Sequence, residues 1–113
     1  MMATSDTTGA VFAALSDDTR RGLFARLGEQ GSASATELAR ELPVSRQAVQ
    51  KHLGVLAEAG LVEAERSGRE VLYHPTPAPL ADALAWMAEV GGQWDGRLAA
   101  LDRQLARGRE RAG

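Results

Sequence analysis

Two capped helical segments, separated by a very short turn, constrain this chain more than any other feature. The first begins at Ser34, which stands three residues before Glu37 in the spacing of a capping box, and Pro43 stops it. The second begins at Ser45, and its apolar residues repeat at helical spacing until Gly60 ends it. Two helices joined by so tight a turn cannot lie in line, so they cross. The pair therefore predicts a helix-turn-helix.

A β-hairpin is expected directly after the second helix of this pair. Residues 61–66 and 70–74 read as two strands around Ser67-Gly68-Arg69, in which Gly68 can supply a positive φ. A hairpin in this position is a wing.

Two more helices are expected before the pair. Thr8 is expected to cap a short helix that carries Val11 and Leu15. The next helix is expected to begin near Asp17 and Asp18, to end at Gly28 and Gly31, and to bury Leu23, Phe24 and Leu27.

The order of elements predicts a mainly α fold with a small β-hairpin, a winged helix-turn-helix. Its order is four helices, two strands and a last helix. Of the 113 residues, 44% are hydrophobic but only 4% are aromatic, so the core must rest on Leu, Val and Ala. We expect residues 1–8 to be a disordered N-terminus and residues 9–108 to form one domain.

The last helix is expected over about residues 78–107, and it carries a heptad seam. Its apolar residues recur at alternating four- and three-residue steps, which is typical of helices that pair with another helix. We therefore expect a homodimer that uses Leu84, Met87, Trp94, Leu98, Leu101 and Leu105. Gly91-Gly92 interrupts the seam and allows either a close approach of two helices or a kink.

The start of the helix after Ser45 carries the candidate binding chemistry. Its outward positions are Arg46, Gln47, Gln50 and Lys51, beside Ser45 itself. Outward residues at this end of a helix-turn-helix reach base edges in the major groove, where Arg and Lys pair with guanine and Gln with adenine. The alternative is an ordinary solvated face of an amphipathic helix.

Three further residues are candidates for contact with double-stranded DNA. Arg66 and Arg69 bracket the hairpin turn and can reach a minor groove or its phosphates. The alternative for both is cross-strand ion pairing with Glu63, Glu65 and Glu70. His52 can either donate to a phosphate or pack against the preceding helix.

Several function classes have no support in the sequence. There is no cysteine, the two histidines stand far apart, and no nucleophile–base grouping or phosphate loop is present. We therefore expect neither an enzyme nor a metal or cofactor site. No apolar segment approaches the ~20 residues that span a bilayer, so a cytoplasmic protein without a membrane partner is expected. The net charge of -2 keeps a second function in view, a winged-helix protein-interaction module without DNA binding.

Several local strings, in this order and spacing, resemble the ArsR/SmtB family of bacterial repressors. The strings lie at residues 15–21, 37–39, 49–53 with Leu56, 59–62 and 68–73. The resemblance implies a homodimer built through the first helix, with Val11 and Leu15, and the last helix. It also implies repression at an inverted-repeat operator, relieved by a small-molecule inducer that the sequence does not identify. The metal-sensing members carry cysteines or last-helix histidines that this chain lacks, so the resemblance is to a subgroup that does not sense metals.

Overall fold

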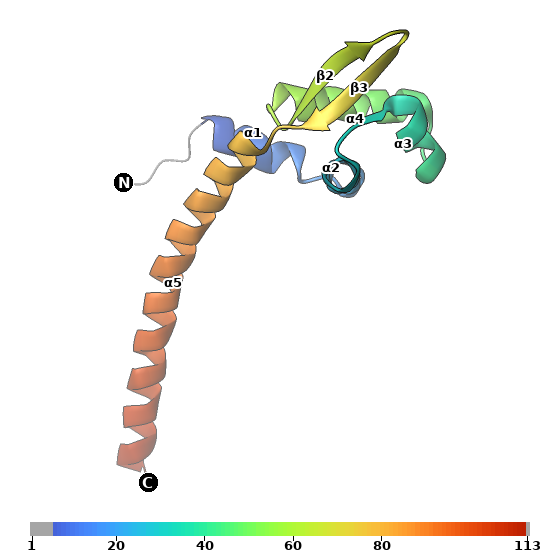
Figure 1. The fold of residues 1–113 in the computed structure, drawn as a ribbon. Coiled ribbons are helices and arrows are strands. Elements are labelled where there is room, and N and C mark those ends of the chain that lie inside the picture. Colours follow the sequence, from blue (N-terminus) through green and yellow to red (C-terminus); the bar gives the residue numbers. More distant parts are fainter. Residues whose placement is uncertain (1–5, 113) are drawn as a thin grey trace. The chain divides into compact units, whose positions relative to one another are not determined.

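The computed structural model describes residues 6–112, apart from the side chains of residues 6, 94, 98 and 109–112 (Figure 1). The described residues belong to two compact units, which divide between Ala83 and Leu84. The elements in chain order are α1 (Asp6–Ala14), α2 (Asp18–Gln30), β1 (Ala33–Ser34), α3 (Ala35–Glu41), α4 (Arg46–Glu58), β2 (Val62–Ser67), β3 (Glu70–Pro75) and α5 (Pro77–Ala112).

The helix-turn-helix is α3 and α4, and its capping chemistry is as predicted. Ser34 Oγ accepts from the Glu37 amide at 3.1 Å, and Glu37 Oε1 accepts from the Ser34 amide at 3.3 Å, which completes the capping box. Ser45 Oγ accepts from the Ala48 amide at 3.1 Å and caps α4. Each serine satisfies amide groups that the first turn of its helix leaves without a partner, so both helices start where the side chains dictate.

Gly60 ends α4 and redirects the chain into the hairpin. Its φ is +78°, and its amide donates to the Ala57 carbonyl at 3.0 Å. The Leu61 amide donates to the Leu56 carbonyl at 3.0 Å. Together these bonds form a Schellman motif, in which Leu61 and Leu56 are both fully buried.

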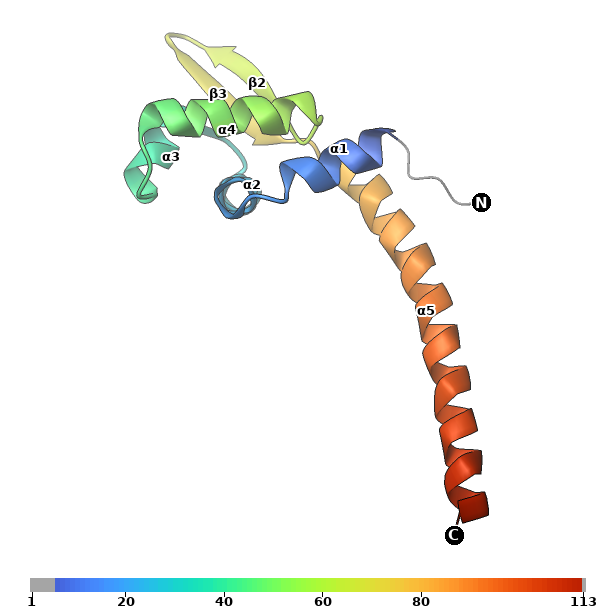
Figure 2. The same cartoon turned by 180° about the vertical axis from the view of Figure 1, so that it is seen from behind.

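The three strands form an antiparallel sheet in the order β1-β3-β2, and Figures 1 and 2 show the hairpin alongside α4 in two opposite views. The pair Ser67↔Glu70 closes the hairpin, which leaves Gly68 and Arg69 as its turn. Gly68 has a φ of +63° and no other residue of the turn has a positive φ, as in a type II′ turn. Ala33 and Ser34 pair with Tyr73 and Leu72 on the other edge of β3.

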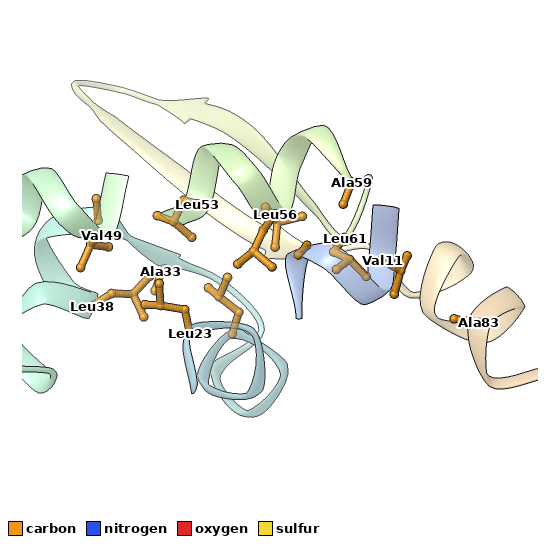
Figure 3. Packing of buried hydrophobic residues seen from close by; sticks show 14 residues of the cluster. Val11, Leu23, Ala33, Leu38, Val49, Leu53, Leu56, Ala59, Leu61 and Ala83 are labelled. Carbon is orange, nitrogen blue, oxygen red and sulfur yellow. The ribbon is translucent and has the colours of Figure 1, made fainter. Parts of the chain in front are cut away.

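The core of the N-terminal unit is aliphatic, as the composition predicts (Figure 3). Leucine, valine and alanine side chains from every helix of the unit meet under α4, with Leu23, Leu27, Leu38, Leu53, Leu56 and Leu61 fully buried. Burying a Leu side chain stabilises a fold by roughly 1.5–3 kcal/mol, so this set dominates the packing. Ala83, near the start of α5, belongs to the same core.

The structure differs from the sequence-based expectations at several points. Helix α1 begins at Asp6, so Thr8 does not cap it but lies buried inside it. Gly28 lies within α2, where Phe24 is only half-buried, and Gly31 alone ends that helix, with a φ of +86°. The strand β1 was not expected, because a two-residue strand carries no alternating pattern.

Helix α5 begins at Pro77, as expected, but extends to Ala112, beyond the expected end near residue 107, and it stays helical through Gly91 and Gly92. Within the described part of the chain, no helix is long and apolar enough to cross a membrane.

Candidate nucleic-acid interface

The N-terminal half of α4 has a polar face of exposed side chains and a buried stripe behind it. Arg46, Gln47, Gln50 and Lys51 are exposed, as is Ser45 at the cap. Val49, Leu53 and Leu56 are fully buried and fix the rotation of the helix about its own axis. Because this apolar stripe faces the core, the polar face on the opposite side of the helix points outward.

The hairpin turn adds two exposed arginines. Arg66 lies near the end of β2, opposite Val71, and Arg69 lies in the turn itself. Among the described residues neither arginine forms an ion pair, while Glu63 lies 3.4 Å from His74 instead. The cross-strand ion pairs considered as an alternative for these arginines are therefore not formed.

A pocket joins α4 to the hairpin. It has a volume of about 210 Å³ and is lined by Thr36 of α3, Arg46 and Gln50 of α4, and Arg69 and Tyr73 of the hairpin, among others. Pairing of β1 with β3 holds the start of α3 against the hairpin at the same place. The sequence predicted both arginines as separate contacts, but it carried no signal that they border one pocket.

Comparison with known proteins identifies this arrangement. A sequence model described as a helix-turn-helix domain matches residues 15–65. The chain is 42% identical over 80 residues to the HTH-type transcriptional regulator Rv2034 of Mycobacterium tuberculosis, covering 71% of this chain and 74% of that protein. It is 31% identical to the transcriptional repressor SdpR of Bacillus subtilis, covering 68% and 84% of the two chains.

The solved structure of an ArsR-like transcriptional regulator from Rhodococcus sp. RHA1 superimposes with a TM-score of 0.73. The two chains are 44% identical, and the match covers 86% of this chain and 91% of that one. The chain belongs to the ArsR family of winged helix-turn-helix transcriptional regulators. The resemblance noted in the sequence and the predicted fold class are thereby confirmed.

In this ArsR-family regulator, His52, one of the residues expected to contact DNA, lies against the start of α2. His52 is only 24% exposed, and its Nδ1 lies 3.5 Å from Arg20 Nη1 and 3.9 Å from Asp17 Oδ2. Both partners belong to the start of α2, because position 52 is on the flank of the buried stripe rather than on the polar face. His52 therefore packs against α2, one of the two environments expected for it.

The same cluster ties three helices together. Arg20 Nε donates to the Ala14 carbonyl at the end of α1 at 2.6 Å, and the Arg20 amide donates to Asp17 Oδ2 at 3.0 Å. That backbone hydrogen bond lowers the pKa of the Asp17 carboxyl below its ordinary value of 3.8. Asp17 is thereby the cap of α2, in contact with α4 through His52.

A second polar cluster fixes α3 against α2. Arg26 Nε donates to Glu41 Oε2, and Gln30 Nε2 donates to the same carboxylate at 3.2 Å. The hydrogen bond from Arg26 lowers the pKa of Glu41 and raises that of Arg26. Helix α3 has only seven residues, so a link from its last residue to α2 restricts its orientation.

The residues expected at the dimer interface of the ArsR-family protein lie in different environments. Val11 is fully buried in the core of its own unit, so it offers no surface to a partner, and Leu15 packs half-buried against that core. Leu84, Met87, Leu101 and Leu105 are 54%, 40%, 50% and 54% exposed. Trp94 and Leu98 lie outside the residues whose side chains are described.

In the described part of the chain, no group of three or more His, Cys, Asp or Glu side chains is arranged to hold a metal ion.

Proposed function

We propose that this ArsR-family regulator is a homodimeric repressor that binds an inverted-repeat operator in double-stranded DNA in the cytoplasm. The observation that carries the proposal is the exposed polar face of α4. Residues 44–56 contain Arg46 and Lys51 but no acidic residue, although the chain as a whole has a net charge of -2. The face presented to a polyanion is thus basic even though the protein is not, and the local field decides binding.

The residue types on this face suit base reading in the major groove. Gln50 has an amide that can donate to and accept from adenine, and Lys51 can pair with guanine or with a phosphate. Ser45 and Gln47 flank them at the end of α4 that enters the groove in helix-turn-helix proteins. The hairpin beside α4, with Arg66 and Arg69, then follows the neighbouring minor groove as a wing.

The exposed apolar row on α5 supports a dimer. Leu84, Met87, Leu101 and Leu105 recur at the spacing of a helix-pairing seam, and a row of this kind is unfavourable in water unless a partner covers it. A two-fold dimer carries two copies of α4 related by symmetry, so its binding site is an inverted repeat. The family relatives include a protein named as a transcriptional repressor, which supports repression as the output.

A direct test is fluorescence-anisotropy titration of the purified protein onto duplexes that tile the DNA upstream of its own gene, at two salt concentrations. We expect tight, sequence-selective binding whose affinity falls steeply with salt, because phosphate contacts release counterions. Weak binding that is indifferent to sequence, both on these duplexes and on a library of fragments from the whole genome, would instead favour the protein-interaction module.

The Gln50→Ala variant tests the reading face at one residue. Loss of a bidentate contact to a base should weaken binding to the cognate duplex about tenfold and relax the preference at one base pair. Sedimentation should show an unchanged dimer, because Gln50 is exposed on α4 and outside the apolar row. Equal affinity of variant and parent for every base at that position would remove Gln50 from the reading face.

A further inference from the structure

Two arginines from different elements of the N-terminal unit line the same pocket. Arg46 lies in the first turn of α4, and Arg69 lies in the turn of the hairpin, far apart in sequence. The pocket between them, of about 210 Å³, also presents Gln50, Tyr73 and Thr36. Figure 1 shows that the hairpin turn lies over the end of α4 that follows α3, which is its N-terminal end.

The charges around this pocket favour an anion. Its lining includes both guanidinium groups and one carboxylate, that of Glu70. Neither the Arg46 nor the Arg69 side chain has a hydrogen-bond or ion-pair partner among the residues that the structure describes, whereas the Arg20, Arg21 and Arg26 side chains are all bound to carbonyls or carboxylates of the chain. Two uncommitted guanidinium groups that border one cavity form a strong site for a phosphate group.

The geometry of DNA places a phosphate at this position. A helix in the major groove and a wing at the adjacent minor groove are separated by one sugar–phosphate strand, because that strand forms the wall between the two grooves. The strand must therefore cross the protein surface between α4 and the hairpin turn, and the pocket lies there.

We propose that Arg46 and Arg69 bind one and the same backbone phosphate of the operator, seated in this pocket. The inference rests on the proposed function and changes the role of one residue within it. Arg46 acts as a phosphate anchor, and base reading is left to residues farther along the polar face of α4. The shared phosphate also couples the wing to the recognition helix. Within the described part of the protein, the side chains of Arg46 and Arg69 form no hydrogen bond or ion pair that would link these two elements.

A double-mutant cycle on the cognate duplex tests whether the two arginines share a phosphate. Each of Arg46→Ala and Arg69→Ala should weaken binding about tenfold, because each removes a charge-assisted hydrogen bond. The loss in the double variant should differ from the product of the single losses, because both groups act on one acceptor. Loss of the whole site should reduce the salt slope by about 0.9, the value for one phosphate, and not by about 1.8.

Arg66→Ala is the matched control on the same hairpin, because Arg66 is exposed but is absent from the lining of the pocket. The loss of affinity in the Arg46→Ala, Arg66→Ala double variant should equal the product of the two single losses, because the two residues act independently. Coupling of Arg46 to Arg66 as strong as its coupling to Arg69 would overturn the proposal.

The sharper readout replaces operator phosphates one at a time by uncharged methylphosphonate. At one position, both Arg46→Ala and Arg69→Ala should bind as tightly as the parent protein does. The two variants could instead match the affinity of the parent at different methylphosphonate positions, or Arg46→Ala could relax the preference at a base pair. Either result disproves the shared phosphate while the repressor function stands. If the parent binds no duplex selectively, the proposed function itself fails.

Discussion

Gly60 shows how much one residue contributes to placing the wing. Its φ of +78° closes the Schellman motif that turns the chain from α4 into β2. A Cβ built on Gly60 would lie 3.3 Å from Pro79 Cγ, so the site is restricted both by backbone conformation and by space. Both restrictions act on the junction that sets the hairpin against α4.

The Gly60→Ala variant should therefore be destabilised by about 1–2 kcal/mol, the cost of a left-handed conformation for an L-residue. Chemical denaturation at neutral pH measures this difference. Gly54→Ala is the matched control, since Gly54 lies inside α4 with nothing near its added Cβ. That change should stabilise the protein, because Ala favours a helix by up to about 1 kcal/mol over Gly. A Gly60→Ala protein as stable as the parent would contradict this account of the junction.

Single residues whose effect is local were predictable from the sequence. Ser34 and Ser45 cap their helices because the side chain acts on the backbone three residues away. The sequence does not decide between the two environments expected for His52, because its partners, Arg20 and Asp17, stand far away in the chain. Helix periodicity places position 52 on a flank but does not say which element packs there.

At the scale of elements, the orientation of α3 depends on its link to α2. Glu41, the last residue of α3, accepts from Arg26 and from Gln30 of α2. Because these donors favour the charged carboxylate, the pKa of Glu41 lies below its ordinary value of 4.5. A group with a lowered pKa in the folded state stabilises the fold above its unfolded-state pKa, and this contribution is lost as the pH falls through the folded-state pKa.

The Glu41→Gln variant should be less stable than the parent at pH 7, and this difference should shrink as the pH falls below 4.5. Denaturation curves of both proteins between pH 7 and pH 3 measure it. Glu58→Gln removes a carboxylate from an exposed position on α4 and controls for the loss of one charge. A gap between parent and Glu41→Gln that stays constant down to pH 3 would show that the pair does not stabilise the fold.

The elements themselves were largely predictable, since caps and hydrophobic spacing are properties of short segments. The exception is β1, whose two residues become a strand only by pairing with Tyr73 and Leu72. Pairing between distant segments leaves no local pattern, and the pocket between Arg46 and Arg69 depends on the same distant pairing. The candidate residues on α4 and the hairpin were therefore found, while their grouping was not.

At the scale of the whole molecule, the proposed regulator needs two copies of the chain. An exposed apolar row on α5 has the spacing that suits a partner helix, and it consists of Leu84, Met87, Leu101 and Leu105. Val11, expected at the same interface, is instead part of the core. Sequence periodicity identifies apolar residues, but it does not separate those buried within one chain from those left for a second.

The Leu101→Glu variant should dissociate the dimer and reduce operator binding with it, because a charge in a helix-pairing seam must be desolvated on association. Sedimentation velocity measures the change from twice 12.0 kDa to the mass of one chain. Arg103→Glu, two positions along and on the other side of the helix, should leave the dimer intact. A Leu101→Glu protein that sediments as the parent does would exclude this row as the interface.

The short strand β1 has a consequence for how this unit tolerates changes of length. Its pairing with Leu72 and Tyr73 anchors these residues of β3 to the start of α3, whereas Gly68 and Arg69 form the turn and pair with no strand. Residues inserted at the turn lengthen the wing and leave the anchor in place. A single residue inserted between the turn and Tyr73, in β3, would exchange the two faces of that strand and displace the start of α3 as well. Insertions at the tip should therefore change the reach of the wing without moving α3, and the site of an insertion matters more than its size.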